Sequence, residues 1–337
     1  MRIALDVMGG DLGPGEIVAG AVQAAREDGA EVTLVGRAAD IERALRGLGG
    51  RPTGLDVVHA PDVIEMDDQP VNAVRAKPQS SMVVGIGLLR AGEASSFVTP
   101  GNTGAAMAAA LFGLRRIPGV ERPALATIFP TLRGHCLLVD VGANVDCKPD
   151  HLLQFAVMGA AYLERVFDRQ YPRVALLSNG EEDTKGNALV HDAYPLLRGS
   201  QLNFVGNVEG KDITQHAADV IVMDGFVGNV VLKHGEGCAK LLGQLIDEEA
   251  RRDPISMLGG LLMKRAFGRV RRRTDYDEYG GAPLLGVQGV CIVAHGRSNA
   301  KAIRSALRVA RHAAEADLTG AIRAGIEAHA RPEGAAV

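Results

Sequence analysis

The stretch S-S-F-V-T-P-G-N-T-G-A-A-M-A-A-A-L-F-G-L, residues 95–114, predicts a strand, a tight turn and a helix. Residues 96–99 form a short apolar strand, and the Pro-Gly pair that follows ends it. Asn102 or Thr103 then caps a helix built largely of alanine, which is a strong helix former. The stretch therefore favours a fold in which strands and helices alternate.

The same turn is suited to an anion. The first backbone N–H groups of a helix have no partner within the helix, and they carry partial positive charge. Gly101 and Gly104 let the main chain approach a ligand closely, while Asn102 and Thr103 add side-chain donors. We therefore expect a phosphate or oxyanion cradle at these four residues, although an ordinary strand-to-helix turn needs the same residue types.

The composition predicts a soluble globular protein with one large core or two lobes around a cleft, because 47% of the 337 residues are hydrophobic. A net formal charge of -3 gives no overall attraction to nucleic acid, so no nucleic-acid partner is expected. The four cysteines have no paired spacing and suit a reducing compartment. The sequence begins directly with a strand and lacks an apolar run of the roughly 20 residues that span a bilayer, which predicts a cytoplasmic protein.

Strands and helices alternate along the chain, which is typical of a mostly parallel sheet with helices on both faces. Apolar strands are expected at residues 2–7, 31–36, 55–60, 96–99, 124–129, 136–141, 173–178, 202–206, 220–223 and 286–294. The segment 234–279 departs from this alternation. We therefore predict a single three-layer α/β/α unit over residues 1–337, with a cleft and a protruding helical hairpin at 234–279.

Polar motifs follow several of these strands, and ligands bind at the carboxyl ends of strands in open α/β sheets. The motifs are D-V-G-A-N-V-D-C-K-P at 140–149, N-G-E-E-D-T-K-G-N at 179–187 and D-G-F-V-G-N-V-V-L-K at 224–233. Together they predict one polar cleft, in which Lys185 reaches bound phosphate. The other candidate substrate-binding residues are Asp6, Asp140, Asn144, Asp146, Asp224 and Ser298.

The sequence lacks the motifs typical of a cysteine nucleophile, of a zinc site and of nucleotide hydrolysis. Cys147 could accept an acyl group with help from Lys148 and His151, but no Cys-His-Asn family motif surrounds it. The cysteines and histidines have no convincing zinc spacing, so no metal and no cofactor are predicted. The loop at 179–187 lacks G-x-x-x-x-G-K-[ST], which argues against nucleotide hydrolysis.

The helical hairpin combines an apolar tip at 255–263 with a basic shoulder. Its apolar residues go around the helix rather than forming one stripe. Such a tip can enter lipid headgroups while the cations contact anionic lipid or an acidic protein; burial in a dimer interface is the alternative. The residues expected to make these contacts are Met257, Leu258, Leu261, Leu262, Lys264, Arg265 and Arg269.

Long motifs, in this order, resemble those of the bacterial phosphate acyltransferases of phospholipid synthesis. They include M-G-G-D, S-M-V-V-G-I-G-L-L-R, P-G-N-T-G, L-Q-F-A-V-M-G, G-N-V-E-G-K-D and G-V-C-I-V-A-H-G-R-S, besides the three strand-end motifs above. The likeness covers nearly the whole chain. It implies an α/β/α fold similar to the isocitrate and isopropylmalate dehydrogenases and to phosphotransacetylases, usually as a homodimer.

The resemblance implies a reaction in which acyl-[acyl carrier protein] and inorganic phosphate give acyl phosphate and free carrier protein. It further implies that the acyl phosphate passes to a membrane-bound glycerol-3-phosphate acyltransferase at the start of phosphatidic acid synthesis. The enzyme would accordingly associate peripherally with the inner face of the cell membrane.

This chemistry needs no strong general base, because phosphate is already an anionic nucleophile and a pantetheine thiolate, with a pKa of about 8.5, is a tolerable leaving group. It needs phosphate held beside the thioester and donors for the tetrahedral oxyanion. The glycine-rich turn and Lys185 are the expected phosphate ligands. Asn229 is expected to orient the thioester, and His295 to protonate the leaving sulfur.

Two other classes stay open on the sequence alone. A decarboxylating dehydrogenase of the same fold would need NAD and a divalent metal, and would bind NADH. A non-catalytic membrane or carrier-protein scaffold would account for the hairpin, but not for the polar loops that converge on one cleft.

Overall fold

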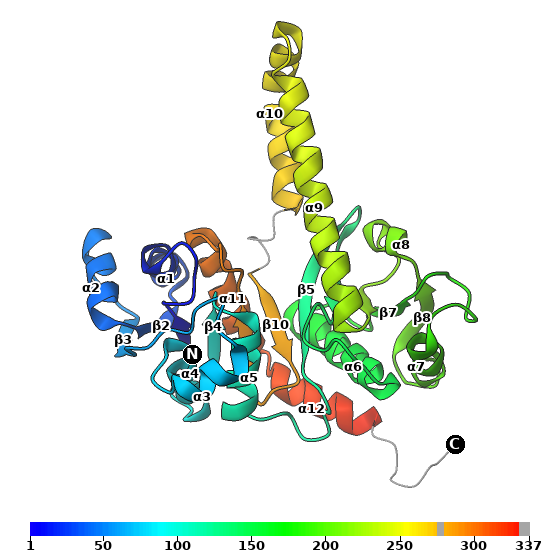
Figure 1. Ribbon diagram of the computed structural model, residues 1–337, viewed down its shortest axis with the longest axis horizontal. Helices are drawn as coiled ribbons and strands as arrows, with labels where there is room; N and C mark the ends of the chain where they lie inside the picture. Colours follow the sequence, from blue (N-terminus) through cyan, green and yellow to red (C-terminus); the bar gives the residue numbers. More distant parts are fainter. Residues whose placement is uncertain (275–279, 330–337) are drawn as a thin grey trace.

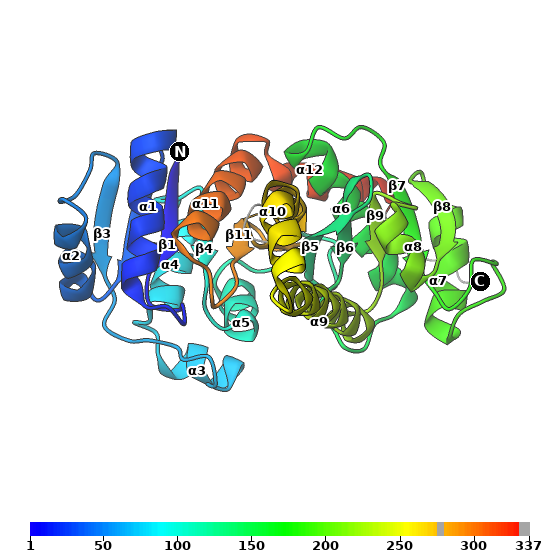
Figure 2. The same ribbon diagram turned by 90° about the horizontal axis from the view of Figure 1, so that it is seen from above.

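The computed structural model describes residues 1–274 and 280–329. Within these residues an 11-stranded sheet has the order β3-β2-β1-β4-β11-β10-β5-β6-β9-β7-β8. The strands are β1 (Arg2–Asp6), β2 (Glu31–Gly36), β3 (Leu55–His59), β4 (Ser96–Thr99), β5 (Ala124–Thr131), β6 (Gly134–Val139), β7 (Arg173–Leu177), β8 (Asn203–Val208), β9 (Val220–Val222), β10 (Ala282–Leu285) and β11 (Val290–Val293). Helices cover both faces of the sheet, so the predicted α/β/α fold class is confirmed (Figure 2).

The sheet consists of two parallel halves that run in opposite directions. Strands β3, β2, β1, β4 and β11 pair in parallel in the first half. Strands β6, β9, β7 and β8 do so in the second half. Three antiparallel pairings, β11 with β10, β10 with β5 and β5 with β6, join the halves. Because the number of reversals is odd, the two halves point opposite ways.

Two sets of helices pack against the two faces. On one face lie α1 (Pro14–Asp28), α2 (Ala38–Gly47), α6 (Pro149–Val166), α7 (Ala188–Arg198), α11 (Ala300–Glu315) and α12 (Leu318–His329). On the other lie α3 (Pro70–Ala76), α4 (Ser81–Arg90), α5 (Thr103–Gly113), α8 (Gly210–Gln215) and the start of α9 (Gly225–Ala250). Successive strand residues alternate between the two cores, as Ile3 and Ala4 do.

The last predicted strand differs in its position. The sequence predicted one strand at 286–294, whereas the structure has β10 before Gly286 and β11 after Gly289. Gly286 has a φ of 92°, a left-handed conformation that interrupts an extended chain and that glycine adopts without strain. The segment is therefore two antiparallel strands joined by a turn.

Two long helices, α9 and α10 (Pro254–Thr274), leave the sheet side by side and form a stalk (Figure 1). The buried residues of α9, Gly225 and Gly228, lie in its first turn. The hairpin predicted at 234–279 overlaps the stalk, and its residues 275–279 lie outside the described residues. Among the residues that the structure describes, no helix combines the length and the apolar content needed to cross a bilayer.

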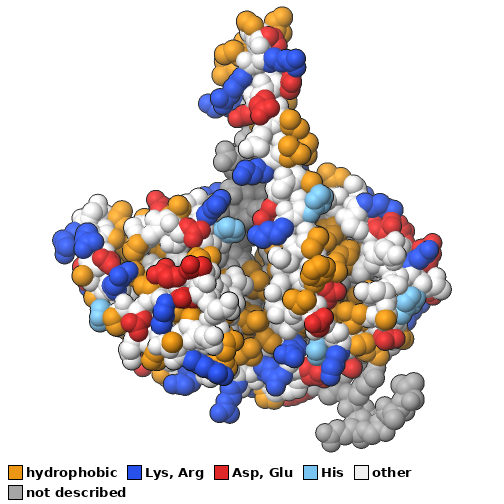
Figure 3. Space-filling model, viewed as in Figure 1, with side chains coloured by type: hydrophobic (Ala, Val, Ile, Leu, Met, Phe, Trp, Pro, Cys, Tyr) orange, Lys and Arg blue, Asp and Glu red, His pale blue; other side chains and the backbone are white. Residues whose placement is uncertain are grey.

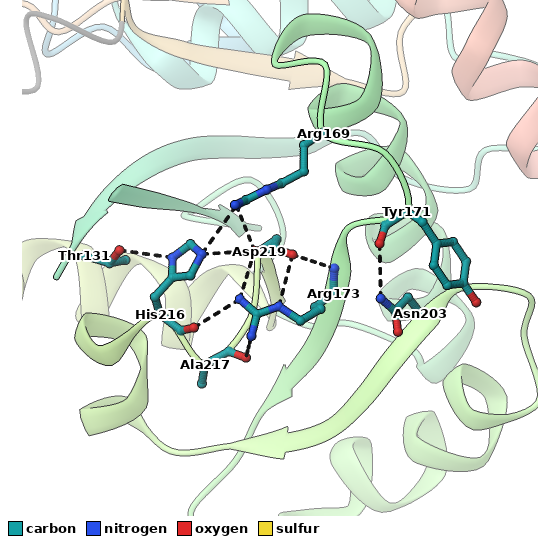
Figure 4. Close-up of polar contacts among 8 residues, drawn as sticks. All are labelled: Thr131, Arg169, Tyr171, Arg173, Asn203, His216, Ala217 and Asp219. Carbon is teal, nitrogen blue, oxygen red and sulfur yellow. Dashed lines mark hydrogen bonds and ion pairs between the residues drawn. The ribbon is translucent and has the colours of Figure 1, made fainter. Parts of the chain in front are cut away.

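A polar network ties together the amino ends of the strands in the second half (Figure 4). The Asp219 carboxylate accepts hydrogen bonds from Arg169 Nη1 (2.8 Å) and from the backbone and side chain of Arg173. His216 Nε2 lies 3.1 Å from this carboxylate, and its Nδ1 lies 3.1 Å from Thr131 Oγ1. Burial alone would raise the pKa of Asp219, but the hydrogen bonds from Arg173 and the charge of Arg169 hold it below its usual value.

Candidate active site

The P-G-N-T-G turn joins β4 to α5, and Asn102 is the capping residue of the helix. Asn102 Oδ1 accepts a hydrogen bond from Ala105 N (3.0 Å), while Nδ2 donates to Met66 O (2.9 Å). The side chain of Asn102 thus shapes the turn. Thr103 and Gly104 occupy the first helical positions, where backbone N–H groups have no partner within the helix.

A second loop, after β1, lies directly against this turn. A Cβ atom on Gly9 would lie 2.6 Å from Gly101 Cα, so only glycine permits this approach. Thr99 Oγ1 donates to Asp6 Oδ2 (2.7 Å) and accepts from Gly101 N (3.0 Å), and Asp6 Oδ1 accepts from Met8 N (3.0 Å). Asp6 is 1% exposed, and burial raises its pKa. Asp6 therefore holds the two loops together.

The loop after β6 is built around a buried carboxylate. Asp140 is fully buried and accepts hydrogen bonds from the backbone N–H groups of Gly142 (3.1 Å), Ala143 (2.8 Å) and Asn144 (2.8 Å). Burial raises the pKa of Asp140, although these hydrogen bonds oppose the shift. Asn144 Nδ2 also donates to Asp140 (2.8 Å), while Asp146 is exposed. Asp140 and Asn144 thus give the loop its shape.

The start of α9 packs on this loop and is fixed there. Asp224 caps the helix, with Oδ1 accepting from Val227 N (2.9 Å). A Cβ atom on Gly228 would lie 1.9 Å from Asp140 O, so the two backbones are in direct contact. This contact positions Asn229, the next residue of the helix.

A cavity of about 620 Å³, the first cavity, brings together four of the predicted residues. Thr103 comes from the start of α5, Asn229 from α9, and His295 and Ser298 from the turn between β11 and α11. The turn after β11 is tied to the loop after β1 by the hydrogen bond from Asp11 N to Gly296 O (2.7 Å). The cavity therefore lies where the carboxyl ends of β4 and β11 face α9.

Two cations that the sequence analysis did not select also line the first cavity, namely Lys233 and Arg297. Lys233 lies one helical turn after Asn229, so the i, i+4 spacing could have identified it. Its Nζ donates to Glu236 Oε2 (3.3 Å). Arg297 N donates to His295 Nδ1 (3.1 Å), which orients the imidazole ring.

The structure places Lys185 elsewhere. A second cavity of about 460 Å³ is lined by Asp224 and by Gly186, the residue after Lys185. Leu176 and Met223, both buried, form part of its apolar wall. The predicted polar residues are thus divided between two cavities on either side of the first turns of α9, and Lys185 is exposed in the loop beside the second cavity.

The geometry does not favour a cysteine nucleophile. Burial, with smaller effects from Asp140 and Asp224, raises the pKa of Cys147 to about 12, so its thiol stays protonated at neutral pH. His151 is occupied at the start of α6, where Nδ1 accepts from Lys148 N (3.1 Å) and Nε2 lies 3.1 Å from a carboxylate oxygen.

Similar folds are found among solved structures. A phosphotransacetylase from Streptococcus pyogenes has a TM-score of 0.63 at 16% identity, over 94% of each chain. A 4-hydroxythreonine-4-phosphate dehydrogenase from Klebsiella pneumoniae has a TM-score of 0.56 at 15% identity, over 93% of this chain and 99% of that one. At such low identity these structures show a shared fold, and they agree with the predicted likeness to phosphotransacetylases and dehydrogenases.

Sequence comparison is more specific. Residues 1–320 match the family described as "Fatty acid synthesis protein". The phosphate acyltransferase of Heliobacterium modesticaldum is 53% identical over 333 residues, which cover 98% of this chain and 99% of that protein. The chain therefore belongs to the phosphate acyltransferase family, and it is an acyltransferase.

Proposed function

We propose that this acyltransferase moves a fatty acyl group from acyl-[acyl carrier protein] to inorganic phosphate and so supplies acyl phosphate for phospholipid synthesis. The observation that carries the proposal is the convergence of Thr103, Asn229, His295 and Ser298 on the first cavity. A helix N-terminus and an exposed arginine meet there beside a histidine, a combination that suits a dianion and a leaving thiolate.

The proposed mechanism assigns one task to each group. Phosphate binds between the N-terminus of α5 at Thr103 and the Arg297 guanidinium, while Asn229 orients the thioester. A phosphate oxygen attacks the thioester carbonyl, the new C–O bond forms, and the C–S bond then breaks. Because His295 Nδ1 accepts a hydrogen bond, the neutral ring carries its proton on Nε2, which can donate it to the sulfur.

The direct test is release of free thiol from palmitoyl-[acyl carrier protein] with and without inorganic phosphate, with hydroxylamine present to trap acyl phosphate. We expect thiol release that depends on phosphate and is accompanied by hydroxamate. Folded protein that releases no thiol in the presence of phosphate would refute the proposal and favour the dehydrogenase or the scaffold. Binding of NADH would distinguish between those two.

Two substitutions distinguish Arg297 from Lys185 as the cation that binds phosphate. Removing a charged hydrogen-bond donor costs about 1.5–3 kcal/mol, so Arg297→Gln should raise the KM for phosphate at least about tenfold. Lys185→Ala should change that KM by less than about twofold, because Lys185 lies beside the second cavity. An equal rise of the KM for phosphate in both variants would show that Lys185 binds phosphate as well.

We further propose that the stalk provides the contacts with the membrane and with a second copy of the chain. Apolar side chains gather at its tip, above a band of charged ones (Figure 3). Ile255 is 84% exposed and Leu262 is 76% exposed, values that suit insertion among lipid headgroups. The basic shoulder at 264–269 follows on α10, where it can contact anionic lipid. This would hold a cytoplasmic enzyme at the inner face of the membrane, near a membrane-bound glycerol-3-phosphate acyltransferase.

The flank of the stalk suits a homodimer. Leu241, Leu242 and Leu245 of α9 are each about half exposed or more. A large apolar surface on a helix pair is stable in water when a second helix pair covers it. Homodimerisation would therefore bury the flank and leave the tip free for lipid.

A further inference from the structure

The floor of the first cavity is a row of side chains that crosses three strands. Val293 of β11 pairs with Ala282 of β10. Leu284 pairs with Leu125 of β5, and continuing this register places Ala282 beside Thr127. Thr127, Ala282 and Val293 all line the cavity. We call this row the strip.

One end of the strip leads to the predicted phosphate cradle. Val293 pairs with Thr99, the last residue of β4. Thr99 Oγ1 in turn accepts the hydrogen bond from Gly101 N, at the turn into α5. Adjacent strands lie about 4.8 Å apart, so the strip runs roughly 14 Å from the end of β4 to β5. A molecule lying along it would have one end beside the helix N-terminus.

The other end of the strip lies under α9. A Cβ atom on Gly235 would be 3.0 Å from the ring of Phe129, so α9 crosses β5 at close range. Leu232, one turn earlier on α9, lines the first cavity from this side. The strip is thus covered by a helix at the end that is remote from the cradle.

The side chains proposed to react gather at one end of the cavity, and the apolar ones of the strip lie toward α9, where Lys233 and Glu236 also line it. Thr103, His295 and Ser298 gather at the end where α5 and α11 begin, while Ala282 and Leu232 border the part beneath α9. A fatty acyl thioester likewise has one reactive end and a long apolar tail that gains about fourfold in binding for each buried methylene, equivalent to ~0.8 kcal/mol.

We infer that the strip is the acyl-chain subsite, with the thioester at the cradle and the tail running across β10 and β5 beneath α9. This inference rests on the function proposed above. The small side chain of Ala282 leaves room for the acyl chain, because a larger side chain at that position would close the strip halfway along. The second cavity is also partly apolar, but it does not contain Thr103 or His295.

Chain-length profiles test the inference. Ala282→Phe should lower kcat/KM for palmitoyl thioester at least about tenfold and leave the value for butyryl thioester within about twofold. Thr127→Phe, farther from the cradle, should tolerate longer chains than Ala282→Phe does. Val190→Phe in the second cavity is the matched control and should leave the profile unchanged.

A binding assay gives a readout that does not depend on turnover. The Kd of the fluorescent fatty acid cis-parinaric acid, and that of the palmitate that displaces it, should both rise at least about tenfold from the wild-type protein to folded Ala282→Phe. Unchanged palmitate binding, an equal loss of activity at every chain length, or a profile altered by Val190→Phe instead would each overturn the subsite. Failure of the proposed function would look different, because the wild-type protein would then release no thiol in response to phosphate.

Discussion

At the scale of single residues, Cys147 is the candidate nucleophile in the loop after β6 that the structure does not favour. Burial keeps this thiol protonated. Cys147→Ser should therefore leave kcat/KM within about twofold of the wild-type value. Thiol-release kinetics measure this, and a loss of several orders of magnitude would instead show that Cys147 reacts.

Alkylation provides the control for Cys147. Cys238 is exposed on α9, whereas Cys136 and Cys291 are buried. Iodoacetamide at neutral pH should label Cys238 first and leave activity largely intact. Activity lost in step with labelling of Cys147 would contradict the protonated state assigned to it.

Asp219 is the residue whose charge should matter most to stability. It is 5% exposed and receives hydrogen bonds from Arg169 and Arg173. Asp219→Asn should lower the free energy of unfolding by about 2 kcal/mol at pH 7, because the arginines lose a buried partner. Urea denaturation measures the loss. Glu249→Gln, in an exposed ion pair with Arg252, should change it by less than about 0.5 kcal/mol.

The pH dependence of this loss follows from the sign of the pKa shift. The pKa of Asp219 is lower in the folded protein than its usual value of 3.8. Its contribution is therefore complete above that value and declines as the pH falls through the folded pKa. The difference between wild type and Asp219→Asn should be constant from pH 7 to about pH 4 and shrink below it. A difference that shrinks already near pH 6 would contradict the lowered pKa of Asp219.

The sequence predicted the positions of the site residues better than their roles. Asp6 and Asp140 lie at strand ends, as their place after apolar runs indicates. Both carboxylates nevertheless point inward and accept hydrogen bonds from backbone N–H groups. A short sequence does not show whether a strand-end carboxylate faces a ligand or its own loop, because both arrangements favour the same residue and the same flanking glycines.

At the scale of elements, the fit of α9 against the loop after β6 controls where Asn229 lies. Gly228→Ala should push the helix away from Asp140 and cost about 1–3 kcal/mol of stability, and it should also reduce kcat. Gly243→Ala is the matched control on the same helix, since a Cβ there meets no neighbour and should stabilise by up to about 1 kcal/mol. Equal effects of the two substitutions on kcat would contradict the contact.

Most helices and strands could be predicted from the periodicity of apolar residues and from the turn residues that end each run. The exceptions have physical causes. The strand-to-helix units around 95–114 and 220–233 were predicted from apolar runs that end in turn residues. Strand β10 was missed because it contains a proline and follows two glycines, residue types that argue against a strand. It owes its existence to pairing with β11 and β5, which are distant in sequence from each other.

At the scale of the whole molecule, the stalk should separate membrane binding from self-association. Ile255→Asp with Leu262→Asp at the tip should weaken binding to anionic lipid vesicles by at least about 100-fold, without changing thiol release in solution. Vesicle sedimentation measures the binding. Retained sedimentation of the tip variant would exclude the tip as the lipid contact.

The flank of the stalk provides the complementary pair of substitutions. Leu242→Asp with Leu245→Asp should convert a homodimer to a monomer, as measured by light scattering. The tip variant should keep the mass of the wild-type protein. A tip variant that is monomeric, or a flank variant that stays dimeric, would reverse the assignment of the two surfaces.

The α/β/α class was predictable from alternation, but the division into two cavities was not. The sequence does not reveal that β10 and β5 reverse the direction of the sheet, because strand order depends on long-range pairing. The first cavity is lined by Val141 and Gly142 after β6 as well as by His295 after β11, and the start of α9 separates it from the second cavity.

Strand β11 has a further consequence for how the protein is made. It lies between β4 and β10 in the sheet, although a ribosome synthesises it long after β4 and after every strand of the second half. The strands of the second half can pair as soon as they emerge, whereas the first half must wait for its missing strand. The cradle and the strip thus become neighbours only after β11 has emerged, so a nascent chain that ends before Val290 lacks the assembled cavity.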